Sequence, residues 1–171
     1  FKVLKNHDLS VRAFYKRMFR MPTFNDLYYT DMGNAFLKPE YAEQFNVGLK
    51  YARDFERSPF MRMLDVSVDA YYNKITDKII AYPKGQQFRW TMLNLGEVEI
   101  KGVDAVLNAL FTLGKLEVTT KFQYTYQEAI DITDPADTYY RDQIPYIPWH
   151  SGSAILALFY KGWGLNYSFI Y

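Results

Sequence analysis

Few residues in this chain have the types and spacing that catalysis requires. The two histidines, His7 and His150, lie near opposite ends of the sequence, and no Gly-x-Ser-x-Gly, phosphate-loop or His-Glu-x-x-His pattern occurs. Cysteine is absent, which excludes disulfides and thiolate metal sites. We therefore predict that the protein is not an enzyme and has no catalytic residue, no metal site and no cofactor.

The clustered aspartates do not require a catalytic role or a metal to explain them. Asp65 and Asp69 fall on one face of a predicted strand, as paired carboxylates would, but solvation in a water-filled interior explains them better. Four more aspartates crowd residues 130–148, namely Asp131, Asp134, Asp137 and Asp142. Calcium is the cation that such a cluster would bind, but the spacing is not that of an EF-hand loop.

Aromatic and charged side chains in predicted loops are better candidates for ligand binding. Rings stack on flat or apolar groups, and arginine pairs with anions. The candidates are Tyr28, Tyr29, Tyr82, Arg89, Trp90, Tyr139, Tyr140 and Arg141, with Lys84 and Gln87 beside them. Anchoring at an interface or packing of loop on loop is the competing interpretation for each one; as a group, we expect one or two to touch a ligand.

Composition narrows the class of protein that carries these loops. The 171 residues include 20 Lys and Arg against 19 Asp and Glu, a formal charge of +1 that gives no field to attract nucleic acid. No apolar run approaches the roughly 18 residues of a membrane-spanning helix. Aromatic residues make up 19% of the chain, more than the core of a domain this size needs, and Tyr is common where one side of a surface is wet.

The hydrophobic pattern has a period of two almost throughout, which predicts β-strands. In residues 62–74, Leu64, Val66 and Val68 alternate with Asp65 and Asp69, and residues 116–127 alternate in the same way. Less regular strands are predicted at residues 9–17, 41–53, 97–111, 151–160 and 163–171. We therefore expect about seven strands of about ten residues and no covering helix.

The connections alternate between short and long. Residues 54–60, 112–115 and 160–163 form short turns, two of them with Gly, whereas residues 18–38, 76–97 and 130–148 form long links. This order predicts an antiparallel up-and-down meander with every long loop at one end.

Two environments suit strands with one apolar and one polar face. In a soluble β-sandwich or lipocalin-like barrel the apolar face packs on a core. In an outer-membrane barrel it meets lipid, the polar face lines the lumen, and aromatic residues mark both interfaces. The strand length, the charges on the polar face and rows ending in Tyr or Phe favour the membrane barrel.

A set of short motifs resembles the barrel of TonB-dependent outer-membrane receptors. The first block is Arg20-x-Pro22-Thr23-Phe24-Asn25-Asp26-Leu27-Tyr28-Tyr29, followed by Gly33-Asn34 and Leu37-Lys38-Pro39-Glu40. Asn94, Gly102-Val103-Asp104 and Ile144-Pro145-Tyr146-Ile147-Pro148 follow in order. The chain departs from the family pattern at two positions. Asn46 stands where an acidic residue is common, and Asp104 stands where Glu is common.

The resemblance implies a location and a function. Residues 1–171 are expected to be a fragment of the C-terminal part of such a barrel, incomplete at both ends and without the plug domain. The protein would lie in the outer membrane of a Gram-negative bacterium, in contact with its lipid. It would take up a scarce nutrient, with energy from TonB through a segment outside this chain. The implied substrate is a metal chelate, most commonly an iron–siderophore, with haem, cobalamin and glycans as alternatives.

Two other functions remain open from the sequence. A passive porin-type channel would need no energy partner, and a soluble ligand-binding barrel or sandwich would need no membrane.

The first motif block also predicts local structure. We expect Pro22 in the first turn of a short helix, Asn25 and Asp26 bonded to nearby backbone, and the apolar residues packed onto the barrel rim.

Overall fold

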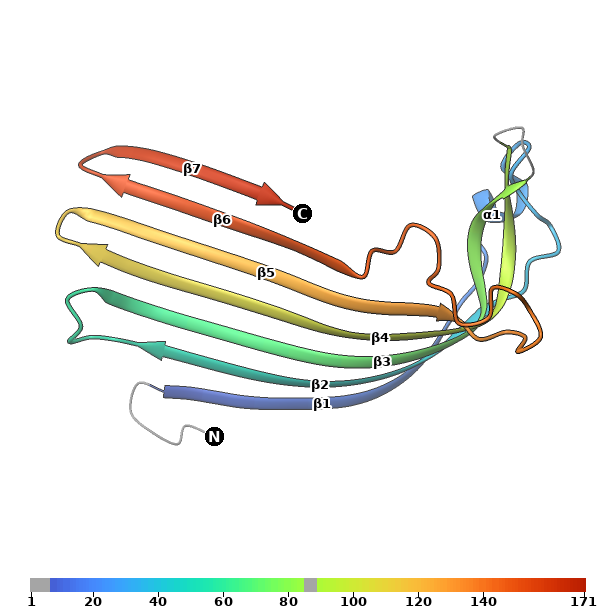
Figure 1. Ribbon diagram of the computed structural model, residues 1–171, viewed down its shortest axis with the longest axis horizontal. Helices are drawn as coiled ribbons and strands as arrows, with labels where there is room; N and C mark the ends of the chain where they lie inside the picture. The colour runs from blue at the N-terminus through green and yellow to red at the C-terminus, as the bar shows by residue number, and fades with distance from the viewer. Residues whose placement is uncertain (1–6, 85–88) are drawn as a thin grey trace.

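A computed structural model describes residues 7–84 and 89–171 and shows one curved antiparallel sheet (Figure 1). Its strands are β1 (His7–Arg20), β2 (Glu40–Asp54), β3 (Met61–Lys84), β4 (Arg89–Leu113), β5 (Leu116–Asp131), β6 (His150–Tyr160) and β7 (Trp163–Ile170). Each strand pairs with the next in chain order, so the all-β up-and-down meander is confirmed. The helix α1 (Phe24–Tyr28) lies in the connection between β1 and β2.

Two details of the prediction are wrong. Five of the seven strands are longer than the expected length of about ten residues, with 24 in β3 and 25 in β4, whereas β6 has 11 and β7 has 8. The predicted long link at residues 76–97 is largely strand, because β3 and β4 continue to pair as far as Lys84 and Arg89. Asp77, with φ of 54°, and Gly96 interrupt the alternation there, which is why the sequence pattern suggested a loop.

The apolar face of the sheet is a set of continuous rows across neighbouring strands. Val68 lies beside Leu49 on β2 and Ala105 on β4, and Leu49 lies in turn beside Val11 on β1. Large parts of the Leu49 and Val68 side chains are exposed. In the described part of the chain no second sheet or helical layer covers this face, as a soluble sandwich would require.

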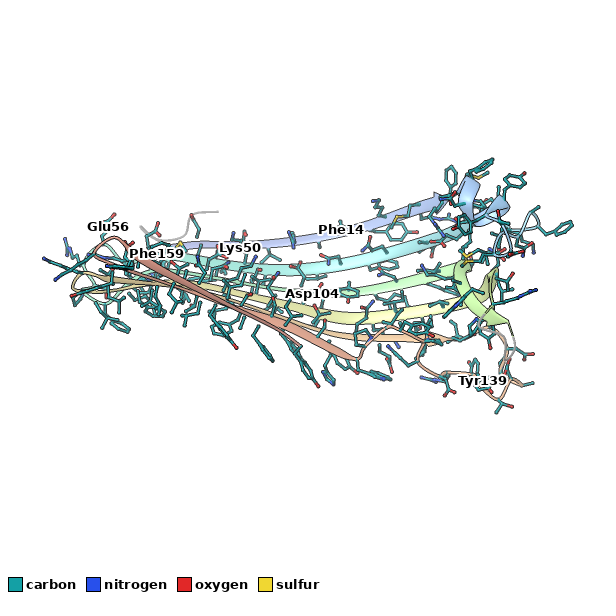
Figure 2. All side chains as sticks on the ribbon, turned by 90° about the horizontal axis from the view of Figure 1, so that it is seen from above. Phe14, Lys50, Glu56, Asp104, Tyr139 and Phe159 are labelled. Atoms are coloured by element: carbon teal, nitrogen blue, oxygen red, sulfur yellow. The ribbon has the colours of Figure 1, made fainter. Side chains whose placement is uncertain are left out.

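The opposite, polar face carries the charges that the alternation predicted. Arg12 forms a two-pronged ion pair with Asp69, at 2.9 and 2.6 Å, across Gly48 on the strand between them. A Cβ at Gly48 would collide with both side chains, so only glycine leaves room for the pair. Lys50 and Asp104 lie on the same face (Figure 2).

The two faces exchange character toward the long-loop end. The aromatic row Tyr15–Phe45–Tyr72 on the apolar face is followed on the same side by the charged row Arg17–Glu43–Lys74. On the polar face, buried apolar side chains appear at this level, namely Ile75, Val98, Ile100 and Ala129. We call the rows of exposed apolar side chains the apolar belt. Beyond this belt the residues still alternate, but the charged side chains now lie on the outer side and the apolar ones on the opposite side.

The belt has the height of a bilayer core. On β4 the apolar side chains run from Val103 to Leu113, which is about 33 Å along a strand at ~3.3 Å per residue. At a tilt of about 40° this becomes about 25 Å, the height of the apolar band of outer-membrane barrels. Among the residues that the structure describes, no helix is long and apolar enough to cross a membrane.

Candidate ligand-binding rim

The three connections at the long-loop end form the candidate site, which we call the rim: residues 21–39, the paired ends of β3 and β4, and residues 132–149. Figure 1 shows them at the same end of the sheet, with the third connection running back beside the end of β5 to reach β6. Figure 2 places Tyr139 of the third connection at the opposite end of the molecule from Glu56 in a short turn.

The first connection is ordered locally by a capping box. Thr23 is the N-cap of α1: its hydroxyl accepts a hydrogen bond from Asp26 N at 3.2 Å, and Asp26 Oδ2 accepts one from Thr23 N at 2.9 Å. The expected backbone bond of Asp26 is present. Pro22 precedes the N-cap, however, and so lies outside the first turn where we expected it.

Two asparagines fasten this connection to β4. Asn94 Oδ1 accepts from Lys38 N at 2.9 Å, and its Nδ2 donates to Lys38 O at 3.0 Å and to Asp77 O at 2.7 Å. Asn34 Nδ2 donates to Met92 O at 3.0 Å. These residues matched the receptor motifs in the sequence, and the structure gives their physical role: they hold backbone that has no strand partner of its own.

A buried carboxylate lies beneath this attachment. Glu40 is only 8% exposed, and its Oε2 accepts from Ile79 N at 3.0 Å and from Arg20 Nη2 at 3.2 Å. Lys78 Nζ lies 3.7 Å from the other carboxylate oxygen. Glu40 therefore joins the end of β1, the start of β2 and the extension of β3.

The third connection covers the edge of β5 where β6 does not reach. Gln143 Oε1 accepts from Ala129 N at 2.9 Å, and its Nε2 donates to Ile147 O at 3.0 Å. Ile144 N donates to Ala129 O at 2.8 Å, and the Ile144 side chain packs into the buried cluster with Val98. The Ile-Pro-Tyr-Ile-Pro motif thus closes the inner side of the rim.

Thr133 fastens the start of the same connection. Its hydroxyl accepts from Glu97 N at 3.0 Å, and Ile132 N donates to Glu97 O at 2.9 Å. Thr133 occupies the space where a Cβ of Gly96 would be.

The aspartates of this connection act as hydrogen-bond acceptors within turns. Each accepts from the backbone N–H two residues ahead, as seen for Asp131, Asp134 and Asp137. No group of side chains that could hold a metal ion occurs in residues 7–84 and 89–171.

The predicted contact residues are divided among the three connections. Tyr28 and Tyr29 are exposed, as is Phe24, so the rings do not pack onto the barrel as expected; hydrogen bonds from Asn34 and Asn94 make that attachment instead. Leu27 is half-buried.

The paired ends of β3 and β4 carry three of the candidates. Tyr82 is 44% exposed, Arg89 is exposed and Trp90 is half-buried. Gln87 lies outside the described residues, as does the side chain of Lys84.

In the third connection, Tyr139 is 67% exposed and Tyr140 is half-buried. Arg141 has φ of 69°, and its N–H donates to Asp131 O at 2.7 Å. The Arg141 side chain is exposed.

The structure adds one residue that the sequence did not single out as a ligand candidate. Tyr146 is 81% exposed, has φ of 67°, and its ring centroid lies 5.8 Å from that of Trp90. The two rings join the second and third connections. Its position between Pro145 and Ile147-Pro148 was the only signal in the sequence.

Comparisons with known proteins agree with this arrangement. Residues 3–171 match the family of TonB dependent receptor-like β-barrels. The vitamin B12 transporter BtuB of Vibrio vulnificus is 34% identical over 99 residues, covering 58% of this chain and 14% of that protein. The vitamin B12 transporter BtuB of Photobacterium profundum is 34% identical over 124 residues, covering 68% of this chain and 18% of that protein.

This chain therefore spans less than a fifth of the length of these relatives. They are transporters, which confirms the prediction that the protein is not an enzyme. The match, the exposed apolar belt and the fastened long loops lead to one conclusion: the chain belongs to the TonB-dependent receptor β-barrel family and lies in the outer membrane of a Gram-negative bacterium.

Proposed function

We propose that the receptor containing this chain takes up vitamin B12 or a closely related corrinoid across the outer membrane, with energy supplied through TonB. The two relatives named above are both vitamin B12 transporters, which supports this substrate over the iron–siderophore that the motifs first suggested. This chain contributes part of the barrel wall and part of the rim that captures the substrate.

The observation that carries the proposal is the exposed aromatic surface of the rim. Tyr82, Tyr139 and Tyr146 expose much of their rings on backbone that hydrogen bonds hold in place, and the Trp90 ring contacts that of Tyr146. A corrin ring offers a broad, largely apolar face on which such rings stack. Because the rim is fastened in advance, little conformational entropy is lost on binding.

The remaining candidates supply polar contacts in this proposal. Arg89 is exposed near the tip of β4 and can donate to the amide oxygens at the edge of a corrinoid. Tyr28, Tyr29 and Tyr140 offer hydroxyl groups in the first and third connections. Arg141 is exposed in the third connection and can also donate to these amide oxygens.

Binding of cyanocobalamin to the full-length receptor in outer-membrane preparations tests the substrate. We expect Trp90→Ala combined with Tyr146→Ala to weaken binding at least tenfold, and Trp163→Ala, at the start of β7 beside the short turn, to leave it unchanged. An excess of a ferric siderophore should not displace cyanocobalamin. Binding of the siderophore, without any binding of cyanocobalamin, would assign the receptor to iron uptake instead.

Uptake in cells that lack TonB tests the energy requirement separately. We expect surface binding of cyanocobalamin to persist while accumulation inside the cell stops. Accumulation at an unchanged rate would identify a passive porin-type channel.

A further inference from the structure

An open cavity of about 700 Å³ lies at the short-turn end of the sheet. Residues 53–58, at the end of β2 and in the turn that follows it, line the cavity together with His7 of β1. Figure 2 shows Glu56 of this turn at the opposite end of the molecule from Tyr139 of the rim. The uptake proposed above makes no use of this cavity.

The level of the cavity follows from the strand register. Tyr51 lies on the apolar face of β2, and Arg53 follows two residues later on the same face, about 7 Å further at the usual rise. His7 pairs with Arg53, and its Nδ1 is hydrogen-bonded to Tyr51 Oη at 2.8 Å. In outer-membrane barrels, aromatic residues mark the edge of the hydrocarbon and short turns lie on the periplasmic side. The cavity therefore faces the headgroups of the periplasmic leaflet.

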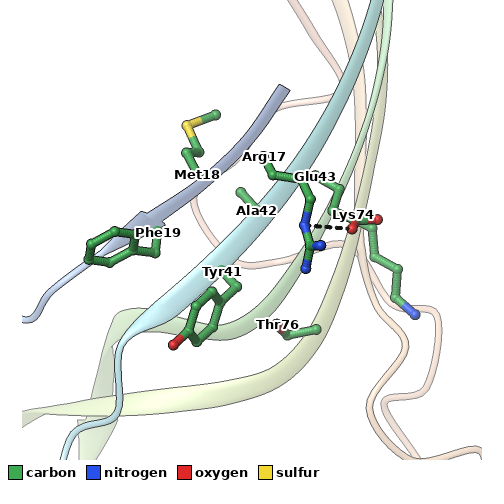
Figure 3. A pocket seen from close by; sticks show the side chains of 8 residues that line it. All are labelled: Arg17, Met18, Phe19, Tyr41, Ala42, Glu43, Lys74 and Thr76. Atoms are coloured by element: carbon green, nitrogen blue, oxygen red, sulfur yellow. Dashed lines mark ion pairs between the residues drawn. The ribbon is translucent and has the colours of Figure 1, made fainter. Parts of the chain in front are cut away.

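The charges that line the cavity are not paired with one another. Two cations and two carboxylates are present, and within residues 7–84 and 89–171 none of the four forms an ion pair: Arg53, Arg57, Asp54 and Glu56. At the long-loop end of the same face the charges do pair, since Arg17 Nε lies 3.1 Å from Glu43 Oε1 (Figure 3). A ligand can therefore bind the charges at the short-turn end without breaking an internal pair.

Two hydrogen-bond donors of the cavity are held in place by their neighbours. The guanidinium carbon of Arg53 lies 4.4 Å from the centroid of the Phe55 ring, a cation–π contact that leaves most of its five N–H donors for an anion. Ser58 Oγ accepts from Phe60 N at 3.3 Å and from Met61 N at 3.1 Å. Because these bonds use only its lone pairs, the Ser58 hydroxyl can still donate.

We propose that this cavity binds the headgroup of phosphatidylethanolamine in the periplasmic leaflet. Arg53 and Arg57 donate to the phosphate, and Asp54 and Glu56 accept from the primary ammonium. The acyl chains of the same lipid lie along the apolar belt, which begins beside the cavity at Tyr51. A headgroup with both signs of charge matches a cavity with both signs of charge. Phosphatidylglycerol has no ammonium, and the quaternary ammonium of phosphatidylcholine cannot donate a hydrogen bond.

Lipid affinities of the full-length receptor test this site. The receptor is delipidated in detergent, and affinity is measured for phosphatidylethanolamine, phosphatidylglycerol and phosphatidylcholine with the same acyl chains. Glycerophosphoethanolamine, which has the headgroup but no acyl chains, is the fourth probe. We expect phosphatidylethanolamine to bind about tenfold more tightly than the other two lipids, because only its headgroup satisfies both pairs of charges. Glycerophosphoethanolamine should bind far more weakly than the lipid.

The two pairs of charged residues should have different effects. Arg53→Gln with Arg57→Gln removes the phosphate donors and should weaken binding of all three lipids about tenfold. Asp54→Asn with Glu56→Gln removes the ammonium acceptors. In this variant, phosphatidylethanolamine should bind no more tightly than phosphatidylglycerol, whose own affinity should not fall.

The next short turn along the chain supplies a matched control. Lys115→Gln with Glu117→Gln removes one exposed cation and one exposed carboxylate that do not line the cavity. This control should keep both the affinity for phosphatidylethanolamine and the preference over phosphatidylglycerol. Heat-dependent mobility on a detergent gel confirms that each variant is folded.

Three results would overturn the proposal. One is equal affinity for phosphatidylethanolamine in the Arg53/Arg57 variant and the unaltered receptor. Another is an undiminished preference for phosphatidylethanolamine in the Asp54/Glu56 variant. The third is binding of glycerophosphoethanolamine as tight as that of the lipid. Binding of cyanocobalamin should not change in any of these variants, so the lipid site and the proposed uptake function can fail independently.

Discussion

The side-chain amide of Asn94 binds both backbone polar groups of Lys38, accepting from its N–H at 2.9 Å and donating to its carbonyl at 3.0 Å. A side chain on β4 thereby replaces a missing strand for the connection between β1 and β2. The same Nδ2 donates to Asp77 O, where the alternation of β3 is interrupted. One amide therefore holds two irregular pieces of backbone together.

Replacing Asn94 should release the first connection without unfolding the sheet. In Asn94→Asp the carboxylate still accepts from Lys38 N, but both Nδ2 donors are lost, and we expect a local cost of about 1–3 kcal/mol. Hydrogen exchange should accelerate in residues 21–39 and remain slow in β5. Asn166→Asp on β7 is the control, and equal acceleration in both variants would contradict the role of Asn94.

Removing the charge of Glu40 should loosen the base of the rim. Its carboxylate is buried and accepts from Ile79 N and Arg20, so Glu40→Gln leaves weaker acceptors beside two cations. We expect a loss of about 1–3 kcal/mol, seen as faster exchange of the Ile79 amide. Glu43→Gln removes an exposed pair with Arg17 and should cost less than about 1 kcal/mol. A larger effect at Glu43 than at Glu40 would show that burial does not control these pairs.

Tyr71 and Gly102 should be energetically coupled. They lie side by side on the polar face, and a Cβ at Gly102 would collide with the phenol ring and hydroxyl of Tyr71. We expect Gly102→Ala to destabilise the folded barrel by about 1–3 kcal/mol, because the ring must move.

A double-mutant cycle checks this coupling. In a Tyr71→Ala background the cost of Gly102→Ala should largely disappear. Urea unfolding in lipid vesicles measures both values. Additive effects of the two substitutions would mean that the ring is free to move.

The sequence predicts the part of the sheet where one face meets an apolar and the other an aqueous environment. Leu64, Val66 and Val68 alternate strictly with polar residues because each environment is uniform along that length. Beyond Tyr72 the outer side carries charge and the inner side is covered by Ile144, so the same alternation appears inverted. The extensions of β3 and β4 pair mainly with each other there, and their pattern resembles a loop.

The rim was only partly predictable for a related reason. Asn94 and Tyr146 both stood in recognisable motifs, but their roles depend on partners remote in sequence, Lys38 and Trp90. The expectation that Tyr28 and Tyr29 pack on the barrel was wrong, because hydrogen bonds already hold their connection. Apolar residue types in a loop do not by themselves show whether the side chains pack on the barrel or are exposed.

Placement of this sheet in the membrane requires lipid to touch the row of Val11, Leu49 and Val68. Because this chain has no cysteine, spin labels can be attached through Val68→Cys and Ser67→Cys in the full-length receptor made cysteine-free and placed in lipid vesicles. Collision rates with oxygen, which concentrates in the bilayer, and with a water-soluble nickel chelate then report the surroundings of each label. We predict a high oxygen-to-nickel ratio at position 68 and a low ratio at position 67. A low ratio at position 68, or equal ratios at the two positions, would contradict the placement of this face in the membrane.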